Sequence, residues 1–125
     1  PVDFPDDTRR AALCALAMRR ELARFNSLRA GRGEPPLEAG IGINRGSVIS
    51  GNIGSKKRMD YTVIGDTVNL ASRLVSAARP GEIIVSRSAA VCLDSSFTLQ
   101  DMGSLKVKGR REPVEVLRLL DGPAE

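Results

Sequence analysis

Histidine and tryptophan are absent from this sequence, and cysteine and aromatic residues are scarce. The chain has 125 residues, with two cysteines, three phenylalanines and one tyrosine. Without histidine and without a CxxC pair, the usual ligand sets of a zinc site are missing. The two cysteines, Cys14 and Cys92, lie far apart in the sequence. They predict two ordinary buried thiols in a reducing compartment, the cytoplasm.

Long apolar runs are also missing. No stretch approaches the ~20 apolar residues that a membrane-spanning helix needs, and no signal peptide is recognisable. The chain begins at Pro1 and not at methionine, so we interpret it as processed, engineered or an excerpt of a longer protein. Any membrane anchor of the parent protein would then lie elsewhere.

The charged residues favour an anionic partner, because the formal net charge is +4. A nucleotide triphosphate and a nucleic acid both have the required sign. A nucleic acid is disfavoured, since the chain has few aromatic residues for base stacking and no long Lys/Arg block. A solvated basic surface remains the simplest alternative.

The apolar periodicity predicts one domain over residues 1–125, of the α/β (α+β) class, with a mixed sheet covered by helices. We expect, in order, a helix at 8–28, two strands within 37–53, a strand at 60–64, a helix at 68–78, a strand at 82–86, a short helix at 87–93, and strands at 97–107 and 114–119. Three β-branched residues in a row at 83–85 indicate that their strand is central.

Two details of these elements are specific enough to test. The first helix should bury one stripe of residues at helical spacing. That stripe consists of Ala11, Cys14, Ala15, Met18, Leu22 and Phe25. The two strands within 37–53 should form a hairpin whose turn is at 44–46, Asn-Arg-Gly.

The glycine-rich run at 40–46 superficially resembles a dinucleotide-binding fingerprint. Such a fingerprint requires a helix that opens directly after the glycines. Here another strand pattern follows, so we interpret these glycines structurally, as positions for tight turns and close backbone approach.

The most informative segment is 60–74, which contains Thr62, Asn69 and Arg73. Asn69 and Arg73 are four residues apart on a predicted helix and therefore share one face. An amide beside a guanidinium suits a phosphate that gains charge in a transition state. The Thr62 hydroxyl can both donate and accept a hydrogen bond, so it could read a base edge. The alternative is an ordinary polar helix face after a strand threonine.

A second segment, 107–111, has the sequence Val-Lys-Gly-Arg-Arg. Lys108 lies next to a glycine in a predicted turn, where a flexible ammonium can meet a phosphate. The alternative is a solvated hairpin tip with three cations.

Together these segments resemble the class III adenylyl and guanylyl cyclase catalytic domain. The matching segments are 40–43, 46–54, 58–74, 80–86, 107–110 and 112–116. The resemblance implies a ferredoxin-like palm with active sites shared between two protomers, which form a head-to-tail dimer. It also implies roles for four residues. Asn69 and Arg73 would be catalytic, stabilising the transition state at the α-phosphate and ribose. Lys108 would hold the terminal phosphates, and Thr62 would help to select the purine.

The resemblance further implies the reaction, which is conversion of ATP to cyclic AMP and pyrophosphate by two-metal-assisted attack of the 3′-hydroxyl on the α-phosphate. Thr62 favours ATP over GTP, because a bacterial subgroup of adenylyl cyclases is similar in having threonine there.

The N-terminus departs from the family pattern. Family domains hold Mg²⁺ or Mn²⁺ with two aspartates that precede the helix with which this chain opens, and Asp3, Asp6 and Asp7 match neither. We therefore expect no metal ligands in this chain, an N-terminally incomplete palm, and no activity of the chain alone. Exposed strand edges would be filled by a partner chain or by swapping of elements. The alternative function is a non-catalytic cyclase-like module that binds a nucleotide or regulates by dimerisation. We prefer the enzyme fragment, because a degenerate domain has little reason to keep Thr62, Asn69, Arg73 and Lys108.

Overall fold

A computed structural model describes residues 5–45, 47–52, 68–106 and 112–123 of the chain. It contains three helices and five strands in these ranges. They are α1 (Pro5–Gly31), β1 (Ala39–Asn44), β2 (Ser47–Asn52), α2 (Val68–Ala77), β3 (Ile83–Ser86), α3 (Arg87–Ala90), β4 (Thr98–Leu105) and β5 (Val114–Asp121). The predicted elements are confirmed except the strand at 60–64, which lies outside the described residues.

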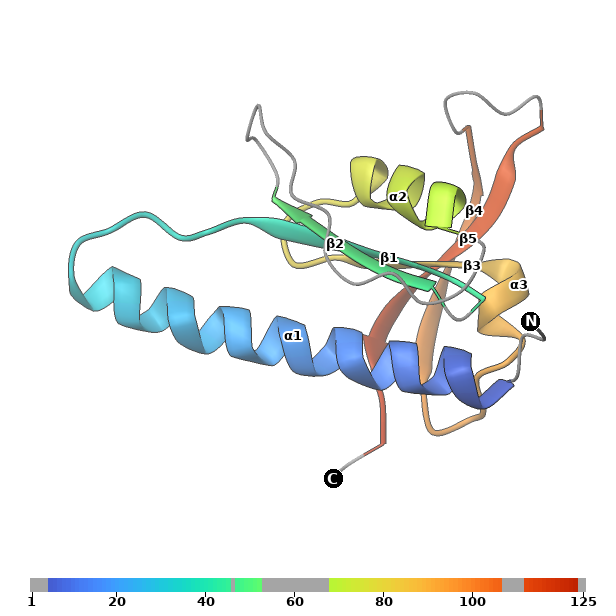
Figure 1. Ribbon diagram of the computed structural model, residues 1–125, viewed down its shortest axis with the longest axis horizontal. Coiled ribbons are helices and arrows are strands. Elements are labelled where there is room, and N and C mark those ends of the chain that lie inside the picture. Colours follow the sequence, from blue (N-terminus) through green and yellow to red (C-terminus); the bar gives the residue numbers. More distant parts are fainter. Residues whose placement is uncertain (1–4, 46, 53–67, 107–111, 124–125) are drawn as a thin grey trace.

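The five strands form one mixed sheet in the order β2-β1-β3-β5-β4. Only β1 and β3 pair in parallel, and the other three pairs are antiparallel. The long helix α1 and the short helix α3 cover one face, and α2 covers the other (Figure 1). The predicted mixed sheet with helical cover is therefore confirmed. The described strands pair without a break.

The two faces of the sheet follow the alternation of side chains along each strand. In β3, Ile83 and Val85 face α1, whereas Ile84 faces α2. All four residues of β3 are buried, and the strand has a neighbour on each edge. The prediction that this strand is central is confirmed.

The stripe that helix α1 buries matches the expected one only in part. Its buried apolar side chains are Ala11, Ala12, Ala15 and Leu16, so Ala11 and Ala15 are as predicted, while Cys14 is exposed and Phe25 is 45% exposed. A helix of 27 residues is about 40 Å long, whereas six-residue strands span about 20 Å. Its N-terminal half therefore packs closely on the sheet, whereas its last turns extend past the strands (Figure 1).

The prediction of two buried thiols is wrong. Cys14 lies on the exposed side of α1, and Cys92, which follows α3, is only partly buried. Periodicity placed Cys14 on an apolar stripe, but the small alanines of the neighbouring stripe allow closer packing on the sheet. None of the described helices combines the length and the apolar character that a bilayer span requires.

The predicted hairpin is confirmed, with Asn44 paired to Ser47 and Arg45 in the left-handed region at φ 35°. Asn44 is buried, and its Oδ1 accepts hydrogen bonds from the hydroxyls of Ser86 (2.7 Å) and Ser88 (3.3 Å). The Ser86 hydroxyl also accepts from the Ala89 amide and thereby caps α3. The ends of the parallel strands β1 and β3 are thus joined by polar side chains.

We expect Asn44→Ala to destabilise the fold by roughly 1–3 kcal/mol, because it removes the nearer acceptor of the buried Ser86 hydroxyl and leaves that hydroxyl only the longer contact with Ser88 at 3.2 Å. Urea denaturation would measure this loss. Ser88→Ala is the matched control, since Ser88 is exposed and its bond to Asn44 is longer. Equal midpoints for Asn44→Ala and the unaltered chain would contradict the prediction.

Candidate functional site

Helix α2 carries two of the four predicted site residues. Asn69 lies in its first turn, and Arg73 follows one turn later on the same side of the helix. Thr62 and Lys108, and the side chain of Asn69, lie outside the described residues. The structure therefore places Asn69 and Arg73 on one face of α2. That all four residues meet in one site stays a prediction.

The Arg73 side chain is exposed, while the opposite side of α2 is buried. The buried residues of this helix are Ala71, Leu74 and Val75, with Ala78 just after its end. Within the described part of the chain, the Arg73 guanidinium has neither an ion pair nor a hydrogen bond. Its five donors are available for an anion.

The close approach of α2 to the sheet depends on Gly42 in the middle of β1. A Cβ built at Gly42 would lie 2.3 Å from the Ala71 carbonyl oxygen and 3.0 Å from both the Leu74 Cβ and the Val75 nitrogen. No real Cβ lies so near a backbone oxygen, so only glycine fits here. The structural interpretation of the glycine run is confirmed at this position.

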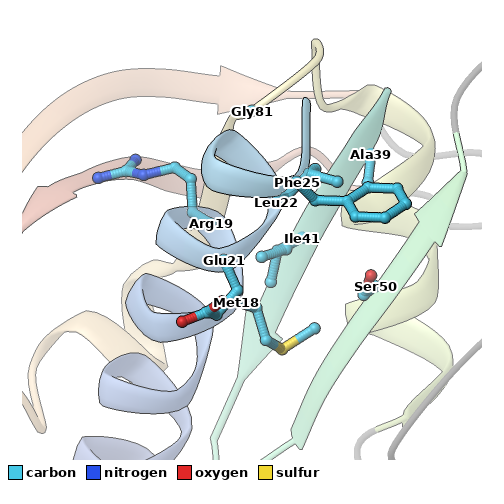
Figure 2. A pocket seen from close by; sticks show the side chains of 9 residues that line it. All are labelled: Met18, Arg19, Glu21, Leu22, Phe25, Ala39, Ile41, Ser50 and Gly81. Carbon is cyan, nitrogen blue, oxygen red and sulfur yellow. The ribbon is translucent and has the colours of Figure 1, made fainter. Parts of the chain in front are cut away.

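A cavity of about 310 Å³ lies on the other face of the sheet, between α1 and the strands β1 and β2. Figure 2 shows that Met18, Leu22 and Phe25 of α1 line it together with Ile41 and Ser50. Its lining is mainly apolar and includes neither Asn69 nor Arg73. This cavity therefore does not match the polar phosphate site that the sequence predicts.

Several of the described carboxylates have partners elsewhere in the molecule. Asp7 forms an ion pair with Arg10 at 3.8 Å. The Gly103 amide and the Arg87 guanidinium lower the pKa of Asp101, and hydrogen bonds from Ser96 lower the pKa of Asp94. No group of three or more acidic or cysteine side chains that could hold a metal ion occurs among the described residues. The expectation that this chain holds no metal ligands stays a prediction, because the family pattern needs two aspartates and part of the chain lies outside the described residues.

Comparison with known proteins decides the family. A sequence profile of the adenylate and guanylate cyclase catalytic domain matches residues 2–119. The chain belongs to the class III nucleotidyl cyclases. Adenylate cyclase 1 of Rhizobium meliloti is 36% identical to this cyclase chain in an alignment of 123 residues that covers 96% of the chain and 18% of that protein.

Two solved cyclases share its fold. The adenylyl cyclase CyaB from P. aeruginosa is 38% identical, with a TM-score of 0.66, and the match covers 86% of this chain and 55% of that one. The guanylyl cyclase Cya2 is 33% identical, with a TM-score of 0.72, and the match covers 98% and 62%. This chain thus spans about a fifth of the Rhizobium relative and about three fifths of each solved chain.

Glu82, between α2 and β3, is a residue for which the sequence analysis predicted no role. Its carboxylate is almost buried and bonds both Arg118 and the backbone just after α2. Its burial could have been suspected from its position, because Glu82 comes directly before the apolar residues of β3, where a solvated side chain would be unusual.

Proposed function

We propose that this chain is part of an adenylyl cyclase that converts ATP to cyclic AMP and pyrophosphate, and that it supplies the groups that stabilise the transition state. The observation that supports this most is the exposed Arg73 on α2, one turn after Asn69, in a chain of the cyclase family. The guanidinium points away from the core and has no partner among the described residues.

The reaction forms a bond between the ribose 3′-oxygen and the α-phosphorus and breaks the bond from that phosphorus to the bridging oxygen. The 3′-hydroxyl loses its proton, and pyrophosphate leaves. Negative charge grows on the α-phosphate oxygens, where the planar fork of Arg73 donates two hydrogen bonds. The amide of Asn69 orients the ribose next to it.

Thr62 and Lys108 complete the proposed substrate site. The Lys108 ammonium neutralises the β- and γ-phosphates, and the Thr62 hydroxyl bonds the adenine edge. Both adenylyl and guanylyl cyclases are similar to this chain, so the choice of ATP rests on Thr62.

In this proposal the divalent ions, Mg²⁺ or Mn²⁺, are held by carboxylates of another polypeptide or segment and not by this chain. When bound, such ions activate the 3′-hydroxyl and neutralise the triphosphate. A second cyclase protomer would complete the active site. The second candidate is a non-catalytic nucleotide-binding or dimerisation module of the same family.

One experiment tests the proposal. The purified chain is incubated with ATP and Mn²⁺, alone and with a second polypeptide that contains the metal-binding aspartates of a cyclase domain. We expect no cyclic AMP from the chain alone and measurable cyclic AMP after mixing. Product from the chain alone would show that it holds the metal itself. Binding of ATP without product in any mixture would favour the non-catalytic module.

A further inference from the structure

Glu82 lies between the two structural elements that carry the proposed site. Asn69 and Arg73 are on α2, whereas Lys108 belongs to the connection between β4 and β5. Glu82 itself is in the turn between α2 and β3, immediately after Gly81, which has a left-handed φ of 77°. Its side chain is 9% exposed, which is low for a carboxylate.

Both oxygens of the Glu82 carboxylate are used. Its Oε2 accepts from Nε of Arg118 at 2.7 Å and from Nη2 of the same guanidinium at 2.6 Å. Its Oε1 accepts from the backbone N–H of Arg79 at 3.1 Å, two residues beyond the end of α2. The third direction of the Arg118 fork reaches Gln100 of β4, with 2.8 Å from Nη1 to Oε1. A single carboxylate thus connects the end of α2 with both strands of the hairpin.

The backbone of Glu82 is also fixed. Its N–H donates to the Arg79 carbonyl at 2.9 Å, and its carbonyl accepts from the Ile41 amide of β1 at 3.0 Å. The side chain therefore starts from a defined point of the sheet. The side chain lies on the face of the sheet that α2 covers. The next residues on that face, Ile84 and Val116, pack against Leu74 and Ala78.

The apolar contacts of α2 are not directional, so they leave the helix some freedom to slide along the sheet. Hydrogen bonds to charged groups have defined directions and fix the helix end. A carboxylate at the C-terminal end of a helix is also repelled by the helix dipole, and here Arg118 supplies the compensating charge. Loss of Arg118 would leave a nearly buried negative charge beside the end of α2.

We propose that Glu82, through Arg118, is a positioning residue that holds α2 in register with the β4–β5 hairpin, and so holds Arg73 in place for the nucleotide. The functional part of this inference rests on the proposed function, whereas the structural part does not.

The test compares Glu82→Ala, Arg118→Ala, the double variant and Arg118→Lys in the full 125-residue chain. Amide hydrogen exchange is followed in α2 and in α1, and the Kd for ATP is measured by calorimetry. The exchange rate of α2 relative to α1 should rise on the order of tenfold in both single variants. The double variant should resemble either single variant, because both break the same link. Arg118→Lys should restore part of the effect, since it keeps the charge but not the fork.

Two controls separate positioning from general loss of stability. Arg87→Ala removes ion pairs with Asp101 and Glu115 on the same hairpin that do not involve α2. Leu119→Val alters the neighbouring residue, which is fully buried and packs against α1, so any local loosening falls on α1. Neither control should raise the α2/α1 exchange ratio, and both should leave the Kd for ATP within about twofold of the unaltered chain.

The outcomes distinguish the two proposals. An unchanged α2/α1 exchange ratio in Glu82→Ala would overturn the positioning role. A raised ratio together with a Kd for ATP weakened by roughly tenfold supports the whole inference. A raised ratio in a chain that binds no ATP would support the structural link and refute the proposed function.

Discussion

Gly42→Ala is expected to be the most destabilising single-methyl change in the described part of this cyclase chain. The added Cβ would lie 2.3 Å from the Ala71 carbonyl oxygen, a backbone atom that no rotamer change can move. Overpacking typically costs 1–3 kcal/mol and occasionally more. Because the clash is with helix backbone, we expect a loss of about 3 kcal/mol, a large part of the stability of a typical domain.

Urea denaturation measures this loss, and the matched control is Gly31→Ala. Gly31 has nothing within 4 Å of an added Cβ and lies in the last turn of α1, where alanine favours the helix. The control should be neutral or slightly more stable. If both variants unfold at the same urea concentration, α2 can withdraw from β1 without cost, and its position over Gly42 is not fixed.

Arg73→Ala is expected to have the largest effect on activity. In the mixed assay with an added metal-binding polypeptide, the rate of cyclic AMP formation should fall by about 10²–10³-fold, the usual cost of removing one preorganised transition-state donor. The free energy of unfolding should stay within about 0.5 kcal/mol, because the side chain is exposed. A loss of rate without a loss of stability assigns the effect to chemistry.

Two further variants sharpen this experiment. Arg73→Lys should not restore the rate, since an ammonium cannot form the two parallel bonds of a guanidinium. Arg79→Ala removes another exposed arginine near the end of α2 and keeps the backbone N–H that Glu82 accepts, so it should retain full activity. Equal rates for Arg73→Ala and Arg79→Ala would refute the catalytic role of Arg73.

Local sequence patterns were sufficient to predict most of the helices and strands. The three β-branched residues of β3 predicted a central strand, and Asn44-Arg45-Gly46 predicted the hairpin turn, because both depend on short-range preferences of the chain. The helix at 68–78 was also predicted, because a ten-residue helix lies within the width of the sheet and its apolar periodicity stays in register with its contacts.

The long helix α1 shows where such patterns fail. Several stripes of a 27-residue helix are apolar enough to be buried, and the apolar periodicity does not determine which of them packs on the sheet. The structure selects the stripe with Ala11, Ala12 and Ala15, whose small side chains allow a close approach, and it leaves Cys14 in solvent. Phe25 is exposed because the helix is longer than the strands it packs on. This mismatch arises only when the helix and the sheet are assembled.

For the site, the sequence by itself determined the residue types, their spacing and the family to which they belong. The side-by-side placement of Asn69 and Arg73 followed from helical geometry alone. The tertiary structure decided what holds their helix in place, namely the contact at Gly42 and the Glu82–Arg118 pair. Gly42 and Ala71 are 29 residues apart and Glu82 and Arg118 are 36 apart, and contacts over such distances arise only when the strands take their order in the sheet.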